Sequence, residues 1–359
     1  MSNILIVMPN DTLGGAEQYL KMVANYFKDS NVFVCFLKAS NTGHWEDLRN
    51  NIKLVHLSKR SYGDGGFKLL AFALHNRTTF DYIFSSHLYI NAIVGGLISL
   101  NIIKTKKFIA RESTSVFPRY HGFKLLTYKL AYKLGYRNMD VLICQTNQMK
   151  SQLLSKVPYL DKRTLVKTIP NPIDLNKITH LGKSELDFIF PKEYIVSAGR
   201  FIKEKGFDIL IKSFSEIKKE YPNLKLVILG EGPLKDSLKI LVSELNVTKD
   251  VVFAGFVKNV YPYFRHARVC VVSSRLEGFP NVLLQMMSQN NNVVSTKCAG
   301  GIENIPGIIT SETNNQNSLT AAILLGLSNF DNKENRRFFG VYLKERDISQ
   351  FMINILSNN

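Results

Sequence analysis

The sequence predicts two α/β domains, each a doubly wound parallel sheet, that face a central cleft. Three observations carry this prediction. Short apolar runs typical of buried parallel strands alternate with helical stretches. The alternation stops near residue 171 and restarts near residue 194. The length of 359 residues also favours two domains over one.

The first half opens with an apolar run at residues 4–8, and Gly14–Gly15 then starts a helix that reaches Phe27. The uncharged stretch 83–103 is not a membrane span, because its polar residues and paired glycines favour a strand, a loop and a helix. The other predicted strands are 32–37, 54–57, 82–85, 108–110 and 141–144, with helices from Phe67, from Tyr89 and over 123–136.

Prolines 170, 172 and 191 bracket a connector with little regular pattern. Beyond it we predict strands at 195–198, 226–229, 251–254, 269–272 and 293–295, and helices at 207–221, 234–245 and 282–289. The predicted organisation is therefore a first domain at 1–175, a linker at 176–193, a second domain at 194–335 and a closing helical segment at 336–359 that packs back on the first domain.

Composition narrows the class of protein. The net charge is +17, with most of the excess in residues 1–175, so nucleic acid, anionic lipid or a polyanionic substrate could each be the partner. The four cysteines lie in or beside apolar runs without metal-ligand spacing, which predicts buried free thiols and a reducing cytoplasm. We expect no signal peptide ahead of the first apolar run.

The richest motif runs from Ser273 to Gln285, between a predicted strand and a predicted helix. Gly278 and Pro280 shape the turn. The amides at the helix start, those of Asn281, Val282 and Leu283, suit an anionic phosphate. Glu277 is unfavourable beside a phosphate unless it accepts hydrogen bonds from sugar hydroxyls; the alternative is that it caps the helix.

A second cluster, residues 199–206, also lies between a strand and a helix. Arg200 can donate to two phosphate oxygens, and Lys205 adds a point charge. Such cations stabilise a leaving diphosphate without a metal ion. The alternative is a solvated surface loop. Because no Asp-x-Asp pair is present, we expect neither a divalent metal nor a cofactor.

Polar residues also follow strands in the first half. His87 ends one predicted strand, and Arg111 and Glu112 follow another, so all three are expected at the ligand-binding edge of the sheet. The alternatives are a buried, hydrogen-bonded histidine and an internal ion pair between Arg111 and Glu112. Gly14–Gly15 would let the backbone approach a ligand, although turns use glycine in any case.

Together these motifs resemble the large retaining glycosyltransferase family of GT-B fold, often called family four, which has two Rossmann-like domains. The resemblance covers nearly the whole chain and is strongest over 194–305. The segment from Glu277 to Leu284 is close to the form seen in bacterial enzymes that build O-antigen, capsule and N-linked glycans on a lipid carrier. The resemblance implies donor-binding roles for Gly14, Gly15, Phe256, Val257, Phe279, Pro280, Asn281, Val282, Leu283 and Gln285.

The resemblance further implies front-face transfer with retention, in which Arg200 and Lys205 stabilise the diphosphate and Glu277 orients the donor sugar. These three are the expected catalytic residues, and no protein nucleophile is required. One position departs from the family pattern. The family has a second glutamate where this chain has Gln285, which keeps an acceptor oxygen for the ribose hydroxyls but loses the charge.

The expected donor is a nucleotide diphosphate sugar, UDP rather than GDP, carrying a hexose or N-acetylhexosamine. The expected acceptor is a polyprenyl-diphosphate-linked or surface glycan, with His87, Arg111 and Glu112 on its side. We expect a cytoplasmic protein that is peripheral on the inner face of the cell membrane.

A helix at 123–137 is the expected membrane contact, because an apolar row is flanked by cations. The alternative is a core helix with a solvated basic edge. The row comprises Phe123, Leu126, Leu130 and Leu134, and the cations are Lys124, Lys129, Lys133 and Arg137.

Two other functions stay open at this point. An epimerase of the same fold would convert a nucleotide sugar without any acceptor. A nucleic-acid-binding protein would use the +17 charge, but the sequence holds no recognised reader module, so we expect no nucleic-acid partner.

Overall fold

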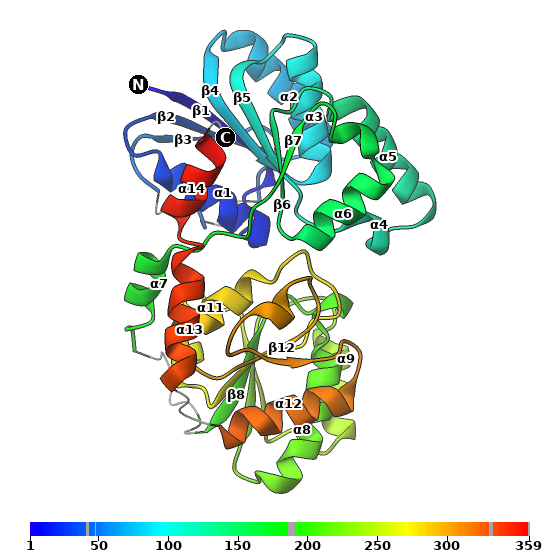
Figure 1. Cartoon of the computed structure of the whole chain (residues 1–359), viewed down its shortest axis with the longest axis vertical. Coiled ribbons are helices and arrows are strands. Elements are labelled where there is room, and N and C mark those ends of the chain that lie inside the picture. The colour runs from blue at the N-terminus through cyan, green and yellow to red at the C-terminus, as the bar shows by residue number, and fades with distance from the viewer. Residues whose placement is uncertain (41–42, 47, 186–190, 192, 330–332, 358–359) are drawn as a thin grey trace. The chain divides into compact units, whose positions relative to one another are not determined.

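The computed structural model covers residues 1–359, and the description below excludes residues 41–42, 47, 186–190, 192, 330–332 and 358–359. The chain forms two compact units. Unit 1 comprises Met1–Pro172 and Ile348–Asn359, and unit 2 comprises Ile173–Asp347. Each unit is a Rossmann-like α/β domain with a parallel sheet, which confirms the predicted fold class (Figure 1).

Unit 1 is built on a seven-stranded parallel sheet with the order β3-β2-β1-β4-β5-β6-β7. Its elements are β1 (Asn3–Asn10), α1 (Gly15–Tyr26), β2 (Asn31–Lys38), β3 (Ile52–His56), α2 (Tyr62–His75), β4 (Thr79–Ser86), α3 (Leu88–Ser99), β5 (Lys104–Arg111), α4 (Val116–Arg119), α5 (Gly122–Gly135), β6 (Val141–Cys144), α6 (Asn147–Lys156), β7 (Leu165–Thr168) and α14 (Ile348–Leu356).

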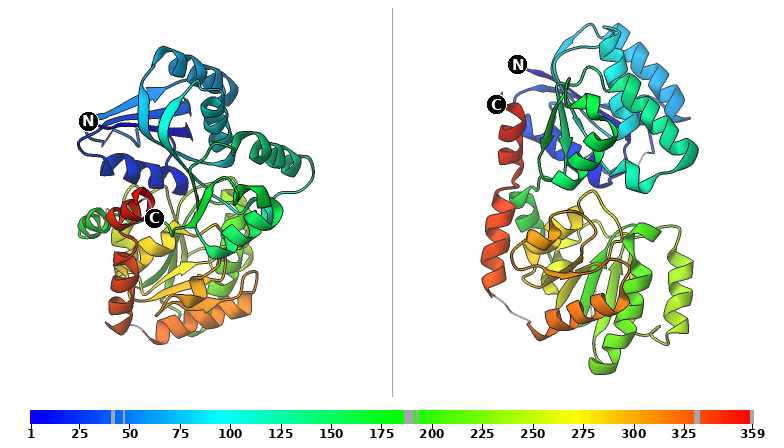
Figure 2. Two further views of the ribbon diagram at one scale, coloured as in Figure 1. Left: turned by 45° about the horizontal axis from the view of Figure 1, so that its top comes forward. Right: turned by 45° about the vertical axis from the view of Figure 1, so that its right-hand side comes forward.

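Both faces of this sheet are covered, which is why the central parts of its strands are apolar, as at residues 4–8 of β1 and 108–110 of β5. On β1, Leu5 and Val7 join a core with α2, α3 and α5, whereas Ile4 and Ile6 join a core with α1 and α14. Figures 1 and 2 show these two sets of helices on opposite sides of the sheet.

Unit 2 is also built on a parallel sheet, which has six strands in the order β10-β9-β8-β11-β12-β13. Its elements are α7 (Leu175–Leu181), β8 (Tyr194–Ala198), the 3-10 turn η2 (Lys203–Lys205), α8 (Phe207–Glu220), β9 (Lys225–Leu229), α9 (Lys235–Glu244), β10 (Val251–Gly255), α10 (Tyr261–His266), β11 (Val269–Val272), α11 (Asn281–Gln289), β12 (Val293–Thr296), β13 (Ile309–Ser311), α12 (Gln316–Ser328) and α13 (Lys333–Lys344).

Two predicted segments differ from the structure. The connector expected to lack regular structure contains α7, which buries Ile178 in the core of unit 2. The closing segment expected as one piece is two helices. α13 buries Phe339 in unit 2, whereas α14 buries Phe351 in unit 1, with its ring 5.5 Å from that of Tyr19.

The strand orders identify where each unit can bind a ligand. In each sheet the winding reverses at one point, between β1 and β4 in unit 1 and between β8 and β11 in unit 2. Ligands of open parallel sheets bind beyond the carboxyl ends of the strands at such a switch point. The loops that follow these four strands therefore decide the function.

None of the helices in the described ranges is long and apolar enough to cross a bilayer. The stretch 83–103 comprises the end of β4, the helix α3 and a turn, as predicted. All four cysteines are buried free thiols, which confirms that prediction.

Candidate functional site

The two loops at the switch point of unit 2 carry the expected catalytic residues. Arg200 and Lys205 follow β8, and Glu277 follows β11. Because β8 and β11 are paired in parallel, the loops that leave their carboxyl ends lie side by side. Residues that are 72 positions apart in the sequence thereby come into contact.

An ion pair joins these loops. Lys205 Nζ lies 2.5 Å from Glu277 Oε1, and Ser274 Oγ donates to the same carboxylate oxygen at 3.0 Å. The Lys205 and Glu277 side chains are 22% and 19% exposed, so the pair is sheltered but reachable from solvent. The N-cap of α11 is Pro280 and not Glu277, which contradicts the capping alternative.

Glycine is required where these loops pass close to other backbone. Gly206, at the start of α8, has φ 65°, and a Cβ there would lie 2.2 Å from the Ser273 carbonyl oxygen. Gly230, after β9, has φ 133°, and a Cβ there would lie 2.0 Å from the Gly199 carbonyl oxygen. Any larger residue would therefore push the loops apart.

Arg200 differs from Lys205 in being exposed. Within the described part of the chain, its guanidinium makes no hydrogen bond or ion pair. An exposed cation beside a sheltered one at the same sheet edge can bind an anion of two linked phosphates.

The start of α11 presents the expected phosphate amides, with one correction. The helix has no side-chain cap among the described residues and no acidic residue in its first turn, so its positive end is not neutralised locally. However, the Leu283 amide already donates to the Pro280 carbonyl at 3.0 Å, and its side chain is fully buried. The phosphate-binding role of the Asn281 and Val282 amides stays a prediction.

The other residues expected to bind the donor differ in how far they are exposed to solvent. Gln285 lies in the second turn of α11, where its Nε2 donates to the Tyr261 hydroxyl at 3.3 Å. The Phe256 ring, just after β10, is 66% exposed, and Val257 beside it is half-buried. Phe279 is 9% exposed, so its ring packs in the core more than it faces solvent.

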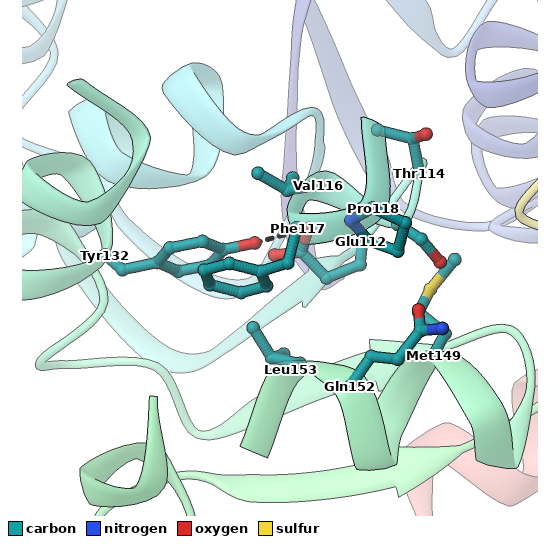
Figure 3. Close-up of a pocket in the computed structure, with 10 residues that line it drawn as sticks. Glu112, Thr114, Val116, Phe117, Pro118, Tyr132, Met149, Gln152 and Leu153 are labelled. Atoms are coloured by element: carbon teal, nitrogen blue, oxygen red, sulfur yellow. Dashed lines mark hydrogen bonds between the residues drawn. The ribbon is translucent and has the colours of Figure 1, made fainter. Parts of the chain in front are cut away.

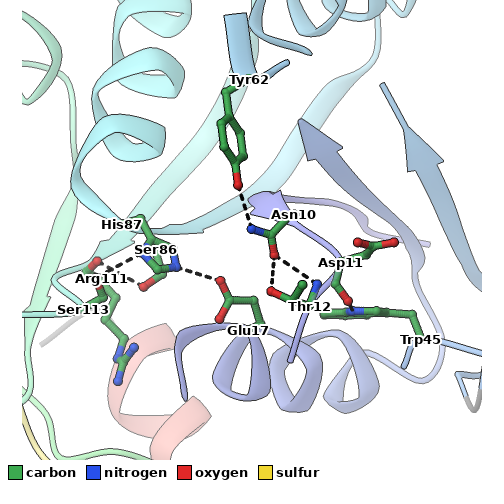
Figure 4. A network of polar contacts seen from close by, with 10 residues as sticks. All are labelled: Asn10, Asp11, Thr12, Glu17, Trp45, Tyr62, Ser86, His87, Arg111 and Ser113. Atoms are coloured by element: carbon green, nitrogen blue, oxygen red, sulfur yellow. Dashed lines mark hydrogen bonds and ion pairs between the residues drawn. The ribbon is translucent and has the colours of Figure 1, made fainter. Parts of the chain in front are cut away.

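In unit 1 the switch-point loops bring His87 to Glu17 (Figure 4). His87 Nε2 lies 2.9 Å from Glu17 Oε1, and Ser113 Oγ lies 3.3 Å from His87 Nδ1. His87 has φ 79°, which is strained for a residue with a side chain. Gly14 is the N-cap of α1 and Gly15 is its first residue, two residues before Glu17, so the glycine loop and the histidine share one edge of the sheet.

Glu17 belongs to the glycine-loop motif Gly14–Gly15–Ala16–Glu17, but the sequence reasoning gave it no role of its own. Burial opposes its ionisation, but the hydrogen bond and charge of His87 and nearby backbone amides lower its pKa overall. A signal was available in the sequence, because only Ala16 separates Glu17 from the glycine pair. Its partner could not be found, since His87 lies 70 positions away.

Arg111 and Glu112 turn to different partners, so the alternative of an internal ion pair between them is wrong. The Arg111 guanidinium donates to Asn171 Oδ1 at 2.5 Å and lies 4.7 Å from the centre of the Tyr19 ring. The Glu112 carboxylate accepts from the Tyr136 and Tyr132 hydroxyls at 2.7 and 3.2 Å.

Burial dominates the titration of both residues, which are each 2% exposed. It raises the pKa of Glu112 to about 7, although the two tyrosine hydroxyls oppose the shift. It lowers the pKa of Arg111 to about 10. Glu112 also lines a shallow pocket of about 210 Å³, counting space open to solvent, together with Tyr132 and Phe117 (Figure 3).

The expected membrane helix is α5, and its apolar row is exposed. Phe123, Leu126, Leu130 and Leu134 are 80%, 61%, 54% and 58% exposed. The opposite face of α5 buries Tyr128, Tyr132 and Gly135, and it packs on α3. The alternative of a core helix is therefore wrong for this row. The cations beside it, Lys124, Lys129, Lys133 and Arg137, are also exposed.

Comparison with known families bears directly on unit 2. Residues 192–329 match the sequence model of the family described as glycosyl transferases group 1. The matched residues all lie within unit 2. The match includes the loops after β8 and β11, and hence Arg200, Lys205 and Glu277.

Curated proteins similar in sequence to this chain are also glycosyltransferases. One is an uncharacterized glycosyltransferase of Methanocaldococcus jannaschii, 36% identical over 48% of this chain and 43% of the relative. Another is the N-acetylgalactosamine-N,N'-diacetylbacillosaminyl-diphospho-undecaprenol 4-alpha-N-acetylgalactosaminyltransferase of Campylobacter jejuni, 32% identical over 60% and 59%. The chain thus matches about half of the length of these relatives.

Solved structures extend the likeness to the whole chain at the level of fold. Sucrose-phosphate synthase from Thermosynechococcus elongatus gives a TM-score of 0.79 at 16% identity, covering 99% of this chain and 97% of that one. Anabaena Alr3699/HepE in complex with UDP gives 0.77 at 16% identity, covering 99% and 98%. The fold is therefore that of the GT-B glycosyltransferases.

Proposed function

We propose that this chain is a retaining glycosyltransferase that moves a hexose or N-acetylhexosamine from a nucleotide diphosphate sugar to a lipid-linked or surface glycan. The observation that carries the proposal is the contact between Lys205 and Glu277 at the switch point of unit 2, inside the matched family domain. In this proposal Lys205 is the cation that binds the diphosphate, and Glu277 is the carboxylate that accepts hydrogen bonds from sugar hydroxyls.

The reaction needs one bond to form and one to break. The acceptor hydroxyl oxygen bonds to the anomeric carbon as the bond from that carbon to the diphosphate oxygen breaks. The departing phosphate oxygen takes the hydroxyl proton on the same face of the sugar, so the configuration is retained. Arg200, Lys205 and the amides of Asn281 and Val282 stabilise the negative charge that develops. Glu277 accepts hydrogen bonds from the sugar and orients it.

UDP is the favoured nucleotide, since the Anabaena relative of this fold was solved with UDP. The exposed Phe256 ring beyond β10 offers a flat apolar surface against which a base can stack. A lipid-linked acceptor is favoured because the Campylobacter relative is named for a diphospho-undecaprenol substrate.

A donor screen tests the proposal. The purified protein is incubated with UDP- and GDP-sugars in EDTA, with and without a polyprenyl-diphosphate-linked glycan. We expect release of UDP that depends on the acceptor and an α-linked product. Activity that is lost in EDTA and restored by manganese would overturn the metal-independent mechanism. Conversion of the nucleotide sugar without any acceptor would instead identify an epimerase.

We further propose that unit 1 binds the inner face of the cell membrane through α5. The apolar row, 54–80% exposed, is large enough to enter the interface, and the four cations beside it complement anionic headgroups. α2, on the same side of the sheet, also exposes Phe67 and Leu74 (Figure 2).

A charge reversal tests this contact. The triple variant Lys124→Glu, Lys129→Glu, Lys133→Glu should release the protein from anionic liposomes at low salt, because each lysine near the surface contributes about 1 kcal/mol. The control reverses three exposed lysines of unit 2, Lys212, Lys219 and Lys239, and should still sediment with the liposomes. Equal binding by both variants would refute the membrane role of α5.

A further inference from the structure

The 3-10 turn η2, which carries Lys205, accepts three hydrogen bonds from the loop after β11. The acceptors are the backbone carbonyls of three successive residues. Arg275 Nη1 donates to the Lys203 carbonyl at 2.6 Å, and the Arg275 amide donates to the Glu204 carbonyl at 2.7 Å. Ser273 Oγ donates to the Lys205 carbonyl at 2.9 Å. Every carbonyl of the 3-10 turn η2 is thus bound by the loop that also carries Glu277.

Arg275 is itself fixed by a two-pronged contact. Its Nη1 and Nη2 donate to the two carboxylate oxygens of Asp208 at 2.8 and 2.6 Å, and its Nε donates to Asn314 Oδ1 at 2.7 Å. Asp208 lies in the first turn of α8, directly beyond the glycine that ends η2. The contact raises the pKa of Arg275, whereas that of Asp208 is lowered although burial opposes the shift, so both stay charged.

We propose that Arg275 and Asp208 are positioning residues that hold the Lys205 ammonium against Glu277 and the donor diphosphate; this rests on the proposed function. A lysine side chain is long and flexible, so the place of its ammonium is set largely by the backbone that carries it. Arg275 ties that backbone to the Glu277 loop. In this proposal Arg275 and Asp208 act on the backbone around Lys205 and do not contact the reacting atoms.

Only arginine can make this set of contacts. Its planar fork spans both oxygens of Asp208 while Nε and Nη1 reach two further acceptors, and a lysine ammonium cannot cover that geometry. Arg275→Lys keeps the charge and should loosen η2 without removing any catalytic group. Misplacing a catalytic cation by about 1 Å can cost up to about 100-fold in rate.

The test is a double-mutant cycle in steady-state kinetics with a UDP-sugar donor. Arg275→Lys should lower kcat about 10- to 100-fold. In a Lys205→Ala background the same change should cost less than about threefold, because the group that it positions is gone. Asp208→Asn should lower kcat by a smaller factor than Arg275→Lys. This loss of kcat should also shrink in the Lys205→Ala background.

Arg268→Lys is the matched control, because Arg268 pairs with Glu193 at 2.7 Å in the same unit but binds no carbonyl of η2. It should keep kcat within about twofold. The inference would be overturned if Arg275→Lys lowered kcat by the same factor in the wild-type and Lys205→Ala backgrounds and also lowered the melting temperature. That result would show a merely structural role for Arg275. A wild-type protein that neither binds UDP nor consumes any donor would instead overturn the proposed function itself.

Discussion

The switch point of unit 2 and the carboxyl end of β5 in unit 1 hold their charged residues in different ways. In unit 2, Lys205 and Glu277 pair with each other and stay about one-fifth exposed. In unit 1, Arg111 and Glu112 are adjacent in sequence and almost fully buried, yet each binds neutral partners: an asparagine and an aromatic ring for one, two tyrosine hydroxyls for the other.

Because of this difference, the charged residues of unit 2 can exchange each other for a ligand, whereas Arg111 and Glu112 of unit 1 cannot. A partly exposed lysine can leave its carboxylate for a phosphate, because solvent and ligand compensate for the lost ion pair. A buried carboxylate held by two tyrosines has no such substitute, so we expect Glu112 to stabilise the fold around it. We therefore expect changes in unit 2 to affect turnover and changes around Glu112 to affect stability.

The largest expected effect is on turnover in unit 2. Glu277→Gln should lower kcat roughly 10²–10³-fold, because the charge-assisted contact to the sugar strengthens as the transition state forms. Donor KM should change far less. The control Glu312→Gln removes an exposed carboxylate paired with Lys297 and should leave kcat unchanged. A Glu277→Gln enzyme with near-normal kcat would remove Glu277 from the catalytic residues.

The next effect is on the stability of unit 1. Glu112→Ala should lower the free energy of unfolding by about 1–3 kcal/mol, because it leaves the Tyr132 and Tyr136 hydroxyls without their acceptor. Glu112→Gln should cost less, since its amide oxygen still accepts. Chemical unfolding of both variants measures the difference. Equal stability of Glu112→Ala and the wild type would contradict the structural role.

The same residue gives the stability a pH dependence. Its pKa in the folded chain is about 7 against an ordinary 4.5, so between these values the folded state binds more protons than the unfolded state. The wild type should therefore lose stability as pH rises through this window. The Gln side chain of Glu112→Gln cannot titrate. The free energy of unfolding of this variant should therefore rise relative to that of the wild type as the pH increases from 5 to 8. Parallel curves for the two proteins would show that Glu112 does not titrate there.

The smallest expected effect concerns Gln285. Gln285→Ala should raise the donor KM by up to about tenfold, the value of one neutral hydrogen bond, with kcat nearly constant. Gln285→Glu should lower this KM or leave it unchanged. Steady-state kinetics on both variants decides the matter. Loss of kcat in Gln285→Glu would show that the amide, which contacts Tyr261, has a role that a carboxylate cannot fill.

Sequence reasoning recovered the strands that are buried on both faces, because continuous apolar runs are a local signal. It missed β7, β13 and the short helices α4, α7 and α10, which are three to seven residues long and depend on tertiary contacts. It also missed two longer helices, α6 with 10 residues and α12 with 13. It expected a closing helical segment at 336–359 but not its break at Glu345, Arg346 and Asp347. This break separates two helices, each with its own buried face in a different unit.

The sequence by itself determined the two parallel-sheet domains and the loops that carry Arg200, Lys205 and Glu277, because these loops follow apolar strands and contain glycines that tight turns require. Only the tertiary structure decided which of their residues meet. The pairs Lys205–Glu277, Glu17–His87 and Arg275–Asp208 each join positions 67 to 72 residues apart. No local pattern encodes such contacts, since they depend on which strands become neighbours in the sheet.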